Sequence, residues 1–151
     1  MEQFLIERLG VDEGKRIHNL VRIRLKELKR HVAKRSFIKT RVLKGMLLLY
    51  VAFYRILMEE EFSEEDAKKL IEEYMLSVDA AKLKRRYDMM DRFSCAYTLF
   101  RTGFVNVVAH ADLWDADIDT SHKEKFSVTI RKCFWNDIFR EYNCPDICRY
   151  A

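Results

Sequence analysis

One stretch of the chain is apolar around nearly its whole helical circumference. The thirteen residues from Met46 to Met58, MLLLYVAFYRILM, contain a single charged side chain, Arg55. A membrane-spanning helix needs roughly 20 apolar residues, so this run predicts a helix buried at the centre of a protein. The helical pattern extends back to about Phe37. A helix buried on all sides needs other elements to cover it, and the rest of the chain must supply them.

Two neighbouring segments have the one-sided apolar pattern that such a cover needs. The first predicts a helix whose stripe repeats at helical spacing: Ile17, Leu20, Val21, Leu25, Leu28 and Val32. The second follows the capping pair Ser63 and Asp66, and its stripe is Ala67, Leu70, Ile71, Tyr74 and Met75. A short helix should precede Gly10, and a less regular helical segment runs from Asp79 to about Phe104, where Gly103 is suited to end it.

The pattern changes near residue 110. The run KFSVTIRK places Phe126, Val128 and Ile130 on one face, as in a half-buried strand. With the extended segment before it, this predicts an antiparallel hairpin of roughly 112–119 and 125–132. A helix, FWNDIFREY, should follow, with Asn143 suited to close it and Pro145 to open another. We therefore expect one α+β domain over 1–151, helical over 1–108, with the hairpin and cysteine-rich helices over 109–151.

The charge is unevenly distributed. Residues 15–44 contain twelve Lys or Arg and one acid, Glu27, although the whole chain carries only +4. Such a face can bind nucleic acid or an anionic membrane, but the only aromatic residue in this range is Phe37, so stacking on bases is not provided for. We expect a solvated face, with no nucleic-acid or membrane partner. No signal peptide is visible, which predicts a cytoplasmic protein with reduced cysteines.

Three of the four cysteines lie near the end of the chain, at Cys133, Cys144 and Cys148. Their spacing lacks the two close Cys pairs of a zinc site, so we expect no metal. Cys133 follows a strand and precedes a helix, where the positive helix end and the basic Arg131 and Lys132 favour a reactive thiolate. The alternative is a packed, inert thiol. Cys95 is expected to be buried in a helix.

Histidine offers a second kind of candidate. His110 and His122 flank the predicted hairpin, and either has the chemistry of a general base. A single histidine is more often structural, so from placement alone His110 is only a candidate.

The stretch FSVTIRKCFWNDIFREYNCPDIC resembles the L-2-amino-thiazoline-4-carboxylic acid hydrolase family. The family pattern is a Phe-x-Val strand, a basic residue and Cys, an aromatic-rich helix, then Pro, an acid, an aliphatic residue and often Cys. The matching residues here are Phe126, Val128, Lys132, Cys133, Phe139, Pro145, Asp146, Ile147 and Cys148. Trp114, upstream of the strand, also fits. The specific match covers about a quarter of the chain.

The resemblance implies a hydrolase that adds water to a cyclic amidine-like ring and yields N-carbamoyl-L-cysteine, without a cofactor. Cys133 and His110 are the implied catalytic residues, and Arg131, Lys132, Trp114 and Cys148 the implied substrate-binding residues, with Arg101 a further possible cation. The alternative is a non-catalytic domain of the same fold that binds a small ligand or has a regulatory role. Family members continue past this motif with a further Cys and Asp, so we expect the chain to be incomplete at its C-terminus.

Overall fold

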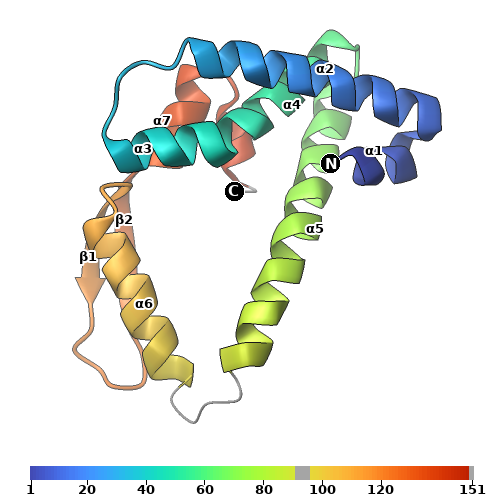
Figure 1. Cartoon of the computed structure of the whole chain (residues 1–151). Coiled ribbons are helices and arrows are strands. Elements are labelled where there is room, and N and C mark those ends of the chain that lie inside the picture. Colours follow the sequence, from blue (N-terminus) through green and yellow to red (C-terminus); the bar gives the residue numbers. More distant parts are fainter. Residues whose placement is uncertain (91–95, 150–151) are drawn as a thin grey trace.

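The computed structural model describes residues 1–90 and 96–149. The central apolar run is helical, as predicted (Figure 1), and it is buried. Helix α4 (Leu48–Glu59) carries most of the run. Its buried side chains face the surrounding helices on almost every side: Leu48, Tyr50, Val51, Ala52, Phe53, Ile56 and Leu57. No helix in the described part of the chain is both long and apolar enough to cross a membrane.

The helix expected from Phe37 to Met58 is present but not uniform. It begins as α3 (Phe37–Val42), widens into a π-helical turn, η1 (Leu43–Leu47), and continues as α4. Ser36 caps its start, because the Ser36 hydroxyl accepts a hydrogen bond from the Lys39 backbone N–H at 3.4 Å. In the π turn, Leu43 and Leu47 are buried whereas the residues between them are exposed, so one extra residue per turn leaves the buried side unbroken.

Helices α1 (Glu2–Leu9) and α2 (Val11–Arg30) form a tight antiparallel pair, and α2 packs on α4. Gly10 ends α1 with a φ of 88°, a left-handed conformation that glycine adopts without strain. Gly14 is buried where the two helices touch, and a Cβ there would lie 2.6 Å from the Ile6 backbone nitrogen. The predicted α2 stripe is confirmed, with Ile17 and Val21 buried and its other members packed against the core.

Helix α5 (Glu64–Met90) begins where the sequence predicts. The Ser63 hydroxyl accepts from the Asp66 backbone N–H at 3.1 Å and donates to the Asp66 carboxylate at 2.6 Å. All five predicted stripe residues of its first half are buried. Helix α6 (Ala96–His110) passes through Gly103, so the expectation that Gly103 ends this segment was wrong: its backbone is an ordinary helical turn with open space around it.

The hairpin is present, so the α+β prediction is confirmed. Strand β1 (Trp114–Asp119) pairs antiparallel with β2 (Ser127–Cys133) and packs beside α6 (Figure 1). In the register, Asp115 faces Lys132 but Ala116 faces Ile130, so Arg131 is an extra residue, a β-bulge. The bulge shifts the alternation of side chains, which the sequence pattern did not predict.

The last elements return the chain to the helical core. Helix α7 (Phe134–Glu141) buries Phe134, Ile138 and Phe139 and begins directly from β2. Asn143 closes it as predicted, with a φ of 60°, and the Cys144 backbone N–H donates to the Phe139 carbonyl at 2.8 Å. The 3₁₀ turn η2 (Pro145–Arg149) follows and packs on α7 and α5.

Candidate functional site

A hollow of about 390 Å³ lies where α3, the start of β1, the end of β2 and the start of α7 meet. Two predicted site residues, Trp114 and Lys132, are part of its wall. The wall combines three cations, three carboxylates and three apolar side chains: Arg35, Lys39, Lys132, Asp112, Asp115, Asp137, Leu113, Trp114 and Phe134. We call this the hairpin hollow.

The cations of the hairpin hollow are held by carboxylates to different degrees. Arg35 donates to both Glu141 oxygens at 2.8 and 2.6 Å, while its buried Nε has no hydrogen-bond partner. Lys39 lies 3.0 Å from Asp112. Lys132 is only loosely placed, 3.7 Å from Asp137, with 70% of its side chain exposed. Lys132 is therefore the cation most readily available to a ligand.

Asp112 is held in an uncommon backbone conformation beside this hollow. Its φ of 52° lies in the left-handed region, which Asp tolerates better than most residues but which still carries strain. Ser36 donates to its carboxylate at 3.5 Å, and Lys39 pairs with the same oxygen. The carboxylate thus has two partners from the start of α3 while 64% of the side chain remains exposed.

Two of the three apolar side chains of the wall, Trp114 and Phe134, are aromatic. Trp114 stacks on Trp135 with ring centroids 5.0 Å apart and planes at 11°, and Phe134 meets Trp135 edge-on. Arg35 and Lys39 lie over the Phe134 ring at 5.9 and 6.0 Å. These contacts fix the orientation of the aromatic groups, because each ring is held by a neighbour from another element or turn.

Cys133 is the N-cap residue of α7 and lies between two residues of the wall, Lys132 and Phe134, but its own side chain is not part of the wall. In the hairpin register it faces Trp114. Its thiol is half-buried and contacts that of Cys148. Burial raises the pKa of the Cys148 thiol, and the charge and hydrogen bond of Cys133 raise it further.

The other two cysteines differ from this pair. Cys144 is buried, and burial raises the pKa of its thiol to about 11, so it is an inert packing group at neutral pH. Cys95 lies outside the described residues.

The predicted arginines lie elsewhere. Arg131, at the bulge, points to the outer face of the hairpin, where it pairs with Asp115 at 2.9 Å and Asp117 at 2.7 Å. These carboxylates raise the pKa of the Arg131 guanidinium, and the largest cause is the hydrogen bond with Asp115, followed by the charge of Asp115. Arg101 donates to the Thr120 carbonyl at 2.7 Å and so ties α6 to the hairpin loop. The structure does not bring either arginine into the wall of the hairpin hollow.

The histidines are also apart from this hollow. His110 ends α6 and is exposed, and its side chain makes no hydrogen bond or ion pair with any residue in the described ranges. His122 lines a separate hollow at the hairpin loop, together with Phe126. Neither histidine is in the wall that holds Trp114 and Lys132.

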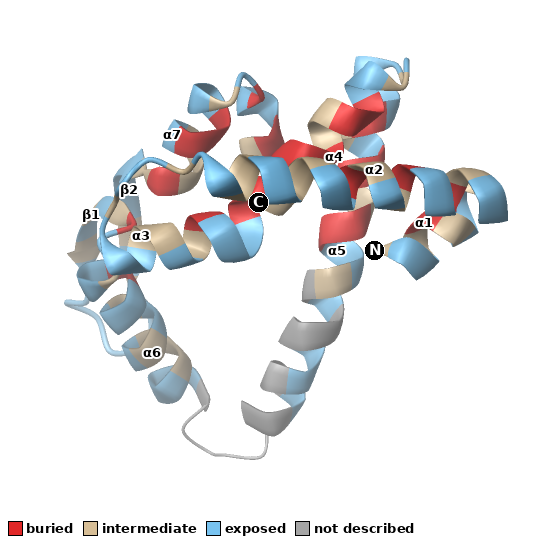
Figure 2. Cartoon of the chain, turned by 45° about the horizontal axis from the view of Figure 1, so that its top comes forward, coloured by how far each residue is buried: buried red, intermediate tan, exposed pale blue. Residues whose placement is uncertain are grey.

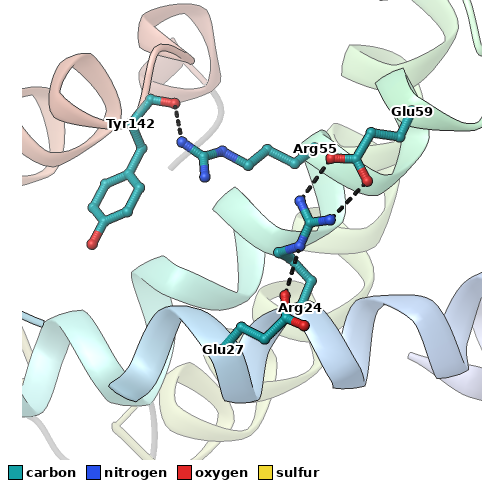
Figure 3. Close-up of polar contacts among 5 residues, drawn as sticks. All are labelled: Arg24, Glu27, Arg55, Glu59 and Tyr142. Atoms are coloured by element: carbon teal, nitrogen blue, oxygen red, sulfur yellow. Dashed lines mark hydrogen bonds and ion pairs between the residues drawn. The ribbon is translucent and has the colours of Figure 1, made fainter. Parts of the chain in front are cut away.

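The lone charge in the apolar helix, Arg55, is a further signal in the sequence. Arg55 donates to the Tyr142 carbonyl at 3.2 Å and its guanidinium lies 5.4 Å from the Tyr142 ring (Figure 3). A cation at this position stabilises the negative end of α7. Beside it, Arg24 donates to both oxygens of Glu59 at 2.7 and 2.9 Å, joining α2 to α4. Both arginines line a second hollow, which lies on the α7 side of the helical core.

Metal ligands do not gather in the part of the chain that the structure describes. Within residues 1–90 and 96–149, no group of three or more His, Cys, Asp or Glu side chains is arranged to hold a metal ion.

Comparison with known proteins adds one finding. Residues 40–151 match the family model described as L-2-amino-thiazoline-4-carboxylic acid hydrolase. This range includes α4, the hairpin and every residue around Cys133. No curated protein and no solved structure matches the chain.

Proposed function

The chain belongs to the L-2-amino-thiazoline-4-carboxylic acid hydrolase family, and on this premise we propose that it hydrolyses a small cyclic amidine of the 2-amino-thiazoline-4-carboxylate type. Such a substrate carries a carboxylate and a basic amidine, so in water near neutral pH it has charges of both signs. The observation that carries the proposal is the mixed-charge wall of the hairpin hollow, with cations and carboxylates beside an aromatic surface.

Lys132 is the proposed partner of the substrate carboxylate. It is exposed and only loosely paired with Asp137, so a ligand does not have to break a strong ion pair to reach it. Arg131, which is the other predicted cation at this position, is already held by Asp115 and Asp117. A charge-assisted hydrogen bond to a carboxylate contributes about 1.5–3 kcal/mol.

Asp112 is the proposed partner of the amidine. Protonation of the ring nitrogen makes the carbon between sulfur and nitrogen more electrophilic, and a neighbouring carboxylate stabilises that protonated form. The strained backbone of Asp112 and its contacts with Ser36 and Lys39 hold the carboxylate at the edge of the hollow. Trp114 supplies a flat surface for the ring.

Cys133 is the proposed nucleophile. Its thiolate would attack the ring carbon, and the ring carbon–sulfur bond would break, so that the substrate sulfur leaves as a thiol after taking up a proton. Water would then add to the same carbon and release the Cys133 thiol, leaving N-carbamoyl-L-cysteine. Support comes from the position of Cys133 at the start of α7, between Lys132 and Phe134 of the wall. His110, which lies apart from the hollow, stays a predicted base.

The test is release of a free thiol from the thiazoline carboxylate, measured with a thiol reagent against a blank that contains the protein alone. We expect turnover by the unmodified chain. Lys132→Ala should lower kcat/KM roughly 10- to 100-fold through the loss of carboxylate binding. Lys26→Ala, an exposed lysine on α2, is the matched control and should change little.

Cys133→Ala should abolish turnover while leaving the thermal unfolding temperature within a few degrees of the unmodified chain. Thiol release equal to the blank would instead favour a domain that binds a small ligand without catalysis. Equal kcat/KM for Lys132→Ala and Lys26→Ala would remove the hairpin hollow as the substrate site.

A further inference from the structure

Two thiols that are fifteen positions apart in the sequence meet in the folded chain, Cys133 at the end of β2 and Cys148 in η2. We propose that Cys133 and Cys148 form a reversible disulfide that switches the hydrolase site off. The consequence for activity rests on the proposed function, whereas formation of the disulfide does not.

The fold brings these two thiols together through two separate local features. The bulge at Arg131 puts Cys133 on the same face of the hairpin as Trp114, its partner in the register. The left-handed turn at Asn143 sends the chain back, and the Ile147 backbone N–H donates to the Cys144 carbonyl at 3.2 Å, which sets the 3₁₀ turn that carries Cys148.

Both thiols are half-buried, so they pack against protein on one side and remain reachable by a small oxidant on the other. Cys148 packs against the hydrophobic core. The neighbouring Cys144 is in a different environment, because it is only 3% exposed and belongs to the core itself. The structure thus separates a pair of half-buried thiols from one fully packed thiol within a short segment.

The chemistry requires a low-molecular-weight disulfide, such as oxidised glutathione, as the oxidant. The Cys133 thiolate attacks one sulfur of that disulfide, and one small thiol leaves. The Cys148 sulfur then attacks the Cys133 sulfur, loses its proton, and displaces the second small thiol. The protein loses two hydrogens and the small disulfide is reduced to two thiols. The raised pKa of Cys148 favours Cys133 as the first attacker, because less of the Cys148 thiol is ionised at neutral pH.

The disulfide would remove the nucleophile of the proposed reaction. It would also join β2 to η2, and so fix the end of the hairpin against the segment that packs on α5 and α7. The site would then be active only in reducing conditions, in which its small-thiol product also remains reduced.

The experiment equilibrates the full chain with mixtures of reduced and oxidised glutathione, blocks the remaining thiols with a maleimide, and maps tryptic peptides by mass without reduction. Trypsin separates residues 133–140 from residues 141–149, and the second peptide holds both Cys144 and Cys148. The variant Cys144→Ala therefore assigns the partner. We expect the linked peptide pair in the unmodified chain and in Cys144→Ala, and its absence from Cys148→Ser.

Two results would overturn the proposal: no linked peptide at any glutathione ratio, or a linked peptide that persists in Cys148→Ser and disappears in Cys144→Ala. The same samples are assayed for thiazoline hydrolysis after removal of glutathione, and oxidation should lower turnover at least tenfold, with recovery after reduction. A linked peptide in a chain with no hydrolytic activity would sink the proposed function alone, whereas turnover that survives complete disulfide formation would sink the switch alone.

Discussion

The helical core and the α6–hairpin region are built in different ways. In the core, α1, α2, α4, the first half of α5 and α7 surround one continuous set of buried side chains (Figure 2). In the α6–hairpin region, residues 96–133, Val108 and Leu113 are the only buried residues among those whose side chains the structure describes. Several large apolar side chains there are exposed: Tyr97, Leu99, Phe104, Val107 and Ile130. The α6–hairpin region therefore depends much less on burial.

Other contacts hold the α6–hairpin region together. Phe126 of the hairpin lies 5.7 Å from Phe104 of α6 between ring centroids. Arg101 bonds to the loop backbone, and Arg131 pairs with two aspartates across the strands. Exposed ion pairs contribute little, commonly under about 1 kcal/mol. The proposed site lies at the boundary between the helical core and the hairpin.

The largest expected effect tests this difference directly. Phe53→Ala removes a fully buried ring from α4 and should lower the free energy of unfolding by about 3–5 kcal/mol. Phe104→Ala removes a ring that is 39% exposed, so its cost should be about 1–2 kcal/mol. Urea denaturation of both variants measures the two changes in the free energy of unfolding. Equal changes would show that the two regions do not differ as described.

Replacement of glycine by alanine should have opposite effects on stability in the two regions. Gly14→Ala would place a Cβ 2.7 Å from the backbone of Leu5, and because α1 must move as a unit we expect a loss of roughly 1–3 kcal/mol. Gly103→Ala meets no atom within 4 Å and sits inside α6, so it should stabilise the chain by about 0.5–1 kcal/mol. Thermal unfolding of the two variants compares them, and destabilisation by Gly103→Ala would mean that α6 is packed more tightly than its surroundings indicate.

The smallest expected effect is a pH dependence. Lys68 of α5 lies 2.6 Å from Asp146 of η2 and lowers the pKa of that carboxyl. A carboxyl whose pKa is lower in the folded than in the unfolded chain stabilises the fold above its unfolded pKa, and this contribution disappears as the pH falls through the folded pKa. Asp146→Asn should therefore be less stable than the unmodified chain at pH 6, with the gap closing below about pH 4.

The matched control lies in the hairpin. The backbone N–H of Ser121 donates to Asp119 at 2.9 Å and lowers the pKa of that carboxyl, but an amide oxygen can accept the same bond. Asp119→Asn should therefore show a smaller gap at pH 6. Denaturation curves at several pH values measure both variants, and a gap for Asp146→Asn that does not change with pH would contradict the role of Lys68.

Much of the fold was predictable from the sequence because it depends on local periodicity. The stripe of α5, the cap at Ser63 and the turn at Asn143 follow from residue types at fixed spacing. The Phe-x-Val strand and the cysteine after it also identified the family.

The rest depends on tertiary contacts. No spacing along the chain reveals that Arg35 and Lys39 reach the same hollow as Lys132, or that Asp112 adopts a left-handed backbone. The pairing of Arg131 with Asp115 and Asp117 was equally hidden, because it depends on strand register. From the sequence one could therefore predict the residue types that a site would need. It was harder to predict which individual residues of those types would form it.

Because of the bulge at Arg131, the face on which Cys133 lies depends on the number of residues in β2. Side chains alternate along a strand, and the extra residue returns Cys133 to the face of Trp114. Removing one residue from β2 would turn the thiol to the outer face, away from Trp114, while leaving the hairpin paired. Residues added to the loop between β1 and β2 would not change which side chains of β2 face Trp114. Related sequences should therefore vary freely in loop length but conserve the number of residues from Ser127 to Cys133.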